Sequence, residues 1–165
     1  MDELEDLSAR VGSALKVRGW WLVTAESCTG GWLGQVVTAV PGSSHWYERG
    51  FITYTNRAKE EMLGVSSETL KRHGAVSEAV VAEMAKGALA KSPADVSVAI
   101  SGIAGPGGAT PDKPVGTVCM AWATREGMLH LRTFHFAGDR AAVRRQAVAA
   151  ALEGLLALVA TPAAT

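Results

Sequence analysis

The chain has 165 residues, a length that fits one domain with its own hydrophobic core. Basic and acidic residues number 16 each, so no overall charge points to a nucleic-acid or acidic partner. Its two cysteines, Cys28 and Cys119, make no disulfide framework and favour a reducing compartment. No run reaches the roughly 18 apolar residues of a membrane span, and the acidic start is unlike a signal peptide. We therefore expect one cytoplasmic domain over residues 1–165, with neither nucleic acid nor membrane as partner.

Hydrophobic spacing along the chain predicts helices and strands that largely alternate. The predicted elements, in order, are a helix over 4–18 ended by Gly19, a strand over about 20–25, a helix over about 30–40, a helical turn over 45–49, a strand over 50–55, a helix over 57–63 capped by Asn56, helices from Ser66 or Ser67 to 73 and from Ser77 to 89, strands over 96–100, 115–123 and 129–136, and a last helix capped by Asp139. The final two strands predict an antiparallel hairpin. The whole order predicts an α/β class, a layered α/β/α sandwich with a mixed, partly parallel sheet.

Three polar turns, over 26–31, 42–44 and 101–108, follow or flank predicted strands. Ligands of open α/β sheets collect at the carboxyl ends of strands, so we expect these turns to meet in one crevice. The first turn has small hydroxyl residues and two glycines before a predicted helix. Its bare backbone N–H groups predict an anion site, or a place where a serine is held rigidly. The alternative is an ordinary helix cap followed by glycine.

Serine and lysine are the most promising chemical groups. The sequence has no P-loop, no G-x-S-x-G and no H-E-x-x-H, and its four histidines lack metal-ligand spacing. We therefore expect neither a metal nor a cofactor. A serine nucleophile needs a base, and a lysine of lowered pKa can act as one. Lys59 lies in a predicted first helical turn, where a cation opposes the dipole, and follows Tyr54, whose phenol is a possible proton relay. The alternative is a solvated lysine beside a packing tyrosine.

Five motifs occur in a characteristic order: Ala25–Gly31, Pro41–Ser44, Tyr54-x-Asn56-x-x-Lys59, His73–Ser77, and Ser101–Gly108 followed by Lys113–Val118. Together they closely resemble the nicotinamide-nucleotide amidase family, also known as the C-terminal domain of competence/damage-inducible protein CinA. The likeness covers nearly the whole chain. The chain looks like the stand-alone form, without the extra N-terminal domain of longer members.

The resemblance implies hydrolysis of nicotinamide mononucleotide to nicotinic acid mononucleotide and ammonia, in the pyridine-nucleotide (NAD) cycle. It also implies a metal-free serine amidase and a homodimer. By motif position, the catalytic group consists of Ser27, Ser44, Tyr54 and Lys59. We favour Ser44 as nucleophile, because it shares one local unit of the chain with Tyr54 and Lys59. Lys59 then activates Ser44 with Tyr54 as relay, while Ser27 and its turn hold the substrate or oxyanion. The reverse assignment of the serines is the alternative, and Cys28 is interpreted as a packing residue.

The substrate of that family carries a phosphate and a cationic ring. Arg140, near the start of the last predicted helix, is the favoured phosphate ligand, and Arg144 is a weaker second choice. The expected substrate-binding set is Thr29, Gly30, Gly31, Ser101, Gly102, Ala104, Gly105 and Arg140. Two other functions stay open: a catalytically silent nucleotide-binding or sensor domain, and an amidase for a different small amide. Retention of all four catalytic positions argues against the silent domain.

Overall fold

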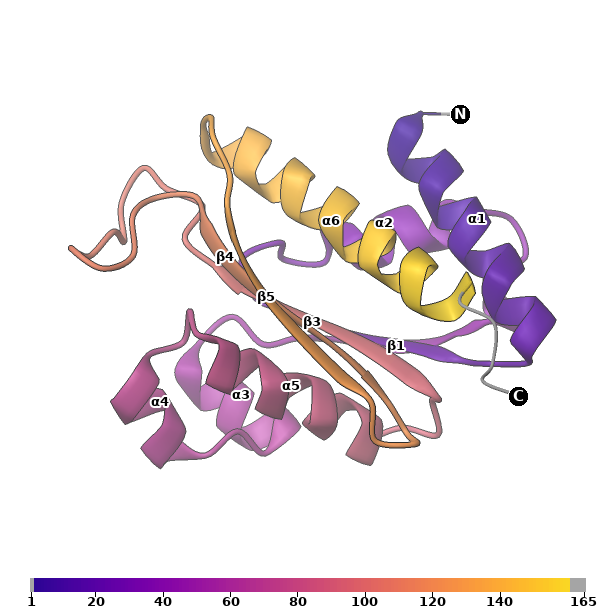
Figure 1. The fold of residues 1–165 in the computed structure, drawn as a ribbon, viewed down its shortest axis with the longest axis horizontal. Helices are drawn as coiled ribbons and strands as arrows, with labels where there is room; N and C mark the ends of the chain where they lie inside the picture. Colours follow the sequence, from indigo (N-terminus) through magenta and orange to yellow (C-terminus); the bar gives the residue numbers. More distant parts are fainter. Residues whose placement is uncertain (1, 161–165) are drawn as a thin grey trace.

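The structure, a computed structural model, describes residues 2–160 as a five-stranded sheet between two layers of helices (Figure 1). Residue 1 and residues 161–165 of the predicted domain lie outside the described residues. The strands are β1 (Leu22–Glu26), β2 (Tyr47–Ile52), β3 (Val96–Gly102), β4 (Thr117–Thr124) and β5 (Leu129–His135). The helices are α1 (Glu3–Arg18), α2 (Trp32–Thr38), α3 (Asn56–Leu63), α4 (Ser67–His73), α5 (Glu78–Ala90) and α6 (Arg140–Ala160), with a short 3-10 helix, η1 (Ser43–His45).

The sheet has the strand order β2-β1-β3-β4-β5. Strand β1 runs parallel to both β2 and β3, whereas β4 is antiparallel to β3 and to β5. The predicted α/β sandwich with a mixed, partly parallel sheet is therefore confirmed. Because β1, β2 and β3 run the same way, the segments that follow Glu26, Ile52 and Gly102 meet at one edge of the sheet.

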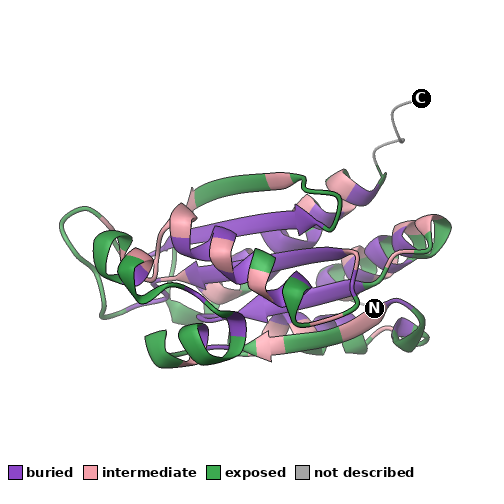
Figure 2. Cartoon of the chain, turned by 90° about the horizontal axis from the view of Figure 1, so that it is seen from below, coloured by how far each residue is buried: buried purple, intermediate pink, exposed green. Residues whose placement is uncertain are grey.

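Each face of the sheet has its own hydrophobic core. Helices α1, α2 and α6 cover one face, where Ile100 of β3 belongs to the same cluster as Leu152 of α6. Helices α3, α4 and α5 cover the other face, where Val23 of β1 clusters with Met84 of α5. The central strands are buried along their length and the two outermost strands, β2 and β5, are more exposed (Figure 2). Burial of apolar side chains thus holds in place the strands whose carboxyl ends meet at one edge of the sheet.

The segment around β2 differs from the sequence prediction. The strand occupies Tyr47–Ile52 rather than 50–55, because its pairing with β1 begins at Tyr47 opposite Leu22. The last link to β1 is the bond from the Thr53 N–H to the Glu26 carbonyl, 2.8 Å long. Thr55, and not Asn56, caps α3, since its hydroxyl accepts the Ala58 N–H at 3.0 Å. Residues 53–55 therefore form a short connection at the carboxyl edge, and the carbonyls of Thr53 and Tyr54 turn toward α3.

Of the helices that the structure describes, none combines the length and apolar character that crossing a bilayer requires.

Candidate active site

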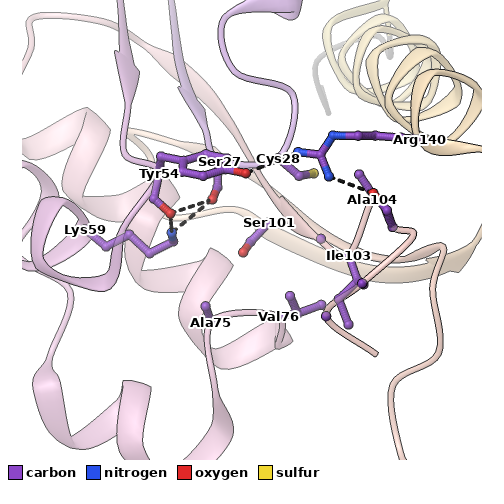
Figure 3. A pocket seen from close by; sticks show the side chains of 14 residues that line it. Ser27, Cys28, Tyr54, Lys59, Ala75, Val76, Ser101, Ile103, Ala104 and Arg140 are labelled. Atoms are coloured by element: carbon purple, nitrogen blue, oxygen red, sulfur yellow. Dashed lines mark hydrogen bonds between the residues drawn. The ribbon is translucent and has the colours of Figure 1, made fainter. Parts of the chain in front are cut away.

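A cavity of about 300 Å³ opens at the carboxyl edge of the three parallel strands (Figure 3). This volume is at the lower end of the range of small-molecule sites. Its walls come from the turn after β1, the connection from β2 into α3, the connection from α4 to α5, the loop after β3, and the start of α6. The lining residues are Ser27, Cys28, Tyr54, Lys59, Ala75, Val76, Ser101, Gly102, Ile103, Ala104, Gly105, Gly107, Gly108 and Arg140.

Lys59 and Ser27 form the chemical centre of this cavity. The Lys59 Nζ lies 3.0 Å from the Ser27 Oγ and also donates to the carbonyls of Thr53 and Tyr54, at 2.8 and 3.2 Å. The lysine is only 1% exposed. Burial disfavours its charged form and lowers its pKa from 10.5 to about 8. An amine that loses its proton near neutral pH, in contact with a hydroxyl, can act as a general base for that hydroxyl.

Tyr54 meets this pair through its main chain rather than its phenol. Its carbonyl accepts from the Lys59 Nζ and, at 3.4 Å, from the Ser27 Oγ. Its phenol oxygen instead accepts from Nη2 of Arg140 at 3.2 Å (Figure 3). The expected contact between the Tyr54 phenol and Lys59 is therefore wrong, because the phenol bonds to Arg140 instead.

Ser44 lies far from Lys59 in the fold. It is an exposed residue of η1, which leads into the start of β2. Ser27 follows the end of β1, and β1 is parallel to β2, so the two serines lie at opposite edges of the sheet. The six residues of β2 span roughly 20 Å between Ser44 and the connection that contacts Lys59. The expectation that Ser44, Tyr54 and Lys59 form one local unit is wrong, because an extended strand intervenes.

The turn after β1 is not an open anion site. The buried Glu26 carboxylate accepts the Thr29 hydroxyl at 2.6 Å and the N–H groups of Gly31, Leu33 and Gly34 at 3.0–3.2 Å. The chain's own carboxylate thus occupies the start of α2, which corrects the predicted anion site. Thr29, Gly30 and Gly31, expected in substrate binding, are outside the cavity lining.

The two arginines of α6 have different surroundings. Arg140 lines the cavity, where its Nη1 donates to the Gly105 carbonyl at 2.7 Å and its Nη2 to Tyr54. Arg144, one turn further on, donates to the carbonyls of Cys28 and Thr29 at 3.0 and 3.1 Å. Its guanidinium also lies over the Trp32 ring, 5.4 Å from the ring centre. Arg144 therefore holds the turn that carries Ser27, and Arg140 faces the cavity.

Comparison with known proteins identifies the chain. The family model of the CinA C-terminal domain matches residues 4–159. The chain belongs to the CinA C-terminal domain family.

Several relatives of this CinA C-terminal domain are closely similar. The nicotinamide-nucleotide amidohydrolase PncC of Escherichia coli strain K12 is 60% identical over 153 residues, 93% of each chain. PncC of Pseudomonas putida is 49% identical over 96% of this chain and 98% of that protein. A solved structure, competence/damage inducible protein CihA from Agrobacterium tumefaciens, superposes with a TM-score of 0.93 at 43% identity over 96% of each chain.

The glycine-rich loop of the CinA C-terminal domain lines the cavity. Ser101, Gly102, Ala104 and Gly105 all lie in the lining. Gly102 is required by close packing, since a Cβ there would lie 2.7 Å from the Val118 side chain and 3.1 Å from the Cys28 sulfur.

Two wall residues, Ala75 and Val76, were missed by sequence reasoning. They lie within the His73–Ser77 motif of the resemblance, but small apolar side chains carry no chemical signature of their own. Cys28 lines the wall as a buried thiol, and burial raises its pKa to about 11. A thiol this weakly acidic is a poor nucleophile near neutral pH, which agrees with its interpretation as a packing residue. Within residues 2–160, no three histidine, cysteine or acidic side chains group as metal ligands would.

Proposed function

We propose that this CinA C-terminal domain hydrolyses the carboxamide of nicotinamide mononucleotide, giving nicotinic acid mononucleotide and ammonia in pyridine-nucleotide recycling. The observation that carries the proposal is the buried Ser27–Lys59 pair on the wall of a cavity that also contains Arg140. The choice of substrate is supported by the 60% identical E. coli protein, which is named nicotinamide-nucleotide amidohydrolase.

The mechanism uses Ser27 as nucleophile and Lys59 as its base. The neutral Lys59 amine takes the proton of the Ser27 hydroxyl as the oxygen attacks the amide carbon. The tetrahedral intermediate expels ammonia, which leaves with a proton returned by the Lys59 ammonium, and an ester to Ser27 remains. Lys59 then deprotonates a water molecule that attacks the ester. The bond from the acyl carbon to the Ser27 oxygen breaks, the Lys59 ammonium returns its proton to that oxygen, and the acid leaves. The carbonyls of Thr53 and Tyr54 hold the lysine nitrogen beside the hydroxyl throughout.

The rest of the cavity supports a nucleotide with its carboxamide at Ser27. Arg140 supplies a guanidinium for the phosphate, and the glycines at 105, 107 and 108 let the backbone approach it closely. Val76 and Ile103 provide apolar wall for a pyridine ring. Ser101, 1% exposed and at the end of β3, lines the same cavity and supplies a further hydroxyl for the carboxamide (Figure 3).

Ammonia release by the purified protein tests this function. We expect turnover of nicotinamide mononucleotide, no effect of a metal chelator, and a much lower kcat/KM for nicotinamide riboside, which lacks the phosphate. Tight binding of the mononucleotide without ammonia release would instead indicate a sensor domain. Equal turnover of both compounds would indicate an amidase for a smaller amide.

The homodimer implied by the resemblance is also a proposal here. Light scattering on the purified protein measures it directly, and a monomer mass would contradict it.

A further inference from the structure

The two ends of Tyr54 contact different parts of the cavity. Its carbonyl accepts from Lys59 and Ser27, at 3.2 and 3.4 Å, whereas its phenol oxygen accepts from Arg140 at 3.2 Å (Figure 3). We propose that the Tyr54 phenol is a positioning residue that acts through Arg140, and that it makes the enzyme prefer the nucleotide over the nucleoside. This inference rests on the proposed function.

The Arg140 guanidinium is held at two points. Its Nη1 donates to the Gly105 carbonyl, in the loop after β3, and its Nη2 donates to the Tyr54 phenol, in the connection after β2. Arg140 is an exposed residue at the start of α6, so without these acceptors its long side chain would sample many rotamers. The two bonds therefore fix the guanidinium at the cavity wall before a ligand arrives.

The held guanidinium keeps donors for a phosphate. Arginine has five N–H groups in a planar fork, and these two bonds use one on each terminal nitrogen. Three N–H groups are left, which is enough for a two-point contact with phosphate oxygens. A phosphate can therefore bind while Tyr54 and Gly105 still hold the arginine.

The same contacts argue against the phenol as a proton relay. A relay must hydrogen-bond to the group that gives or takes the proton, and the contacts of Tyr54 with Lys59 and Ser27 are made by its carbonyl. The tyrosine is 61% exposed, and its phenol bonds to a permanent cation. A phenylalanine at this position would keep the carbonyl and remove only the hold on Arg140.

The experiment compares Tyr54→Phe with wild type on nicotinamide mononucleotide and nicotinamide riboside, by ammonia release. We expect KM for the mononucleotide to rise roughly tenfold, the scale of one hydrogen bond to a charged group, with kcat and its pH profile unchanged. The kcat/KM for the riboside should be unchanged. In an Arg140→Met background, Tyr54→Phe should cause no further loss, because both changes act on one contact.

The chain's other tyrosine provides a matched control. The Tyr47 hydroxyl lies 2.6 Å from the Thr24 hydroxyl and is outside the cavity lining, so Tyr47→Phe also removes one phenol hydrogen bond. Its preference for nucleotide over riboside should equal that of wild type.

A different result would overturn the inference. A fall in kcat by the same factor for both substrates, or a shifted pH profile, would identify the phenol as a proton relay. If wild type releases no ammonia from the mononucleotide, the proposed function fails. Calorimetric binding of the mononucleotide and the riboside then tests the positioning role alone, and equal affinities of wild type and Tyr54→Phe for the mononucleotide would refute it.

Discussion

The Lys59 Nζ lies 3.0 Å from the Ser27 Oγ, although the two residues are 32 positions apart in the chain. The parallel pairing of β1 with β2 brings the ends of both strands to one edge, and the first turn of α3 returns Lys59 to it. The Lys59 side chain, whose charge is unfavourable near the start of α3, is thus directed into the interior. There burial, rather than a charged neighbour, is the main influence on its pKa.

The two serines can be separated by substitution. Ser27→Ala should lower kcat for nicotinamide mononucleotide by at least about a thousandfold, because it removes the proposed nucleophile. Ser44→Ala removes a hydroxyl at the opposite edge and should stay within about twofold of wild type. Steady-state ammonia release measures both. Loss of turnover in Ser44→Ala alone would return the nucleophile to Ser44.

The pH dependence of kcat/KM should report Lys59. In the proposed mechanism the reactive form is the neutral amine, and with a pKa of about 8 it makes up about one tenth of the lysine at pH 7. Activity should therefore rise about tenfold per pH unit below 8 and level off above it. The rise should persist in Cys28→Ala, since the pKa of the Cys28 thiol is about 11. A flat profile between pH 6 and 8 would contradict a lysine base.

Lys59 should also make stability depend on pH. Its pKa is lower in the folded than in the unfolded chain, so the unfolded chain binds more protons between pH 8 and 10.5. The unfolding free energy of wild type relative to Lys59→Met should therefore increase across that window, by on the order of 3 kcal/mol at most. Urea denaturation at pH 7.5 and 10 measures it. A difference that stays constant, or that falls with pH, would disprove the buried, easily deprotonated lysine.

Substitution of each arginine to methionine should have a different outcome. Arg140→Met should lower kcat/KM for nicotinamide mononucleotide roughly a hundredfold and leave the riboside unaffected, because the proposed phosphate contact is lost. Arg144→Met loosens the turn that carries Ser27 and should lower kcat for both substrates by similar factors. Ratios of kcat/KM between the two substrates separate these roles. A phosphate-specific loss in Arg144→Met would show that the ligand reaches beyond the cavity lining.

Glu26→Gln should weaken the turn after β1. The glutamine side chain replaces one carboxylate oxygen with an NH2 group. That group must face an N–H that now donates to the carboxylate, so a buried donor is left unpaired. The free energy of unfolding should fall by about 1–3 kcal/mol. Glu83→Gln is the matched control: its carboxylate accepts one N–H, that of Ser66, in a half-buried position, so its loss should be smaller. Denaturant titration compares the two variants. Equal losses of unfolding free energy would contradict a larger contribution of the Glu26 cap to stability.

Local patterns in the sequence determined much of the fold. Gly19 ends α1 with a left-handed φ of 67°, and the hydroxyl of Ser77 and the carboxylate of Asp139 accept the N–H groups of Val80 and Ala142. These features depend on residues within one turn of each other, so the sequence alone could indicate them. Apolar runs similarly predicted most strands, and their order with the helices predicted the layered class.

Tertiary structure decided the site within that frame. Local spacing favoured Ser44 as the partner of Lys59, but the direction of β2 places Ser44 at the far edge and Ser27 beside the amine. The anion site predicted from small residues and glycines is filled by Glu26, whose side chain folds back over the turn. Spacing along a chain fixes neighbours only within one element. Which side chains share a cavity depends on strand direction, strand order and the rotamers that packing allows, and those follow from burial of the whole chain.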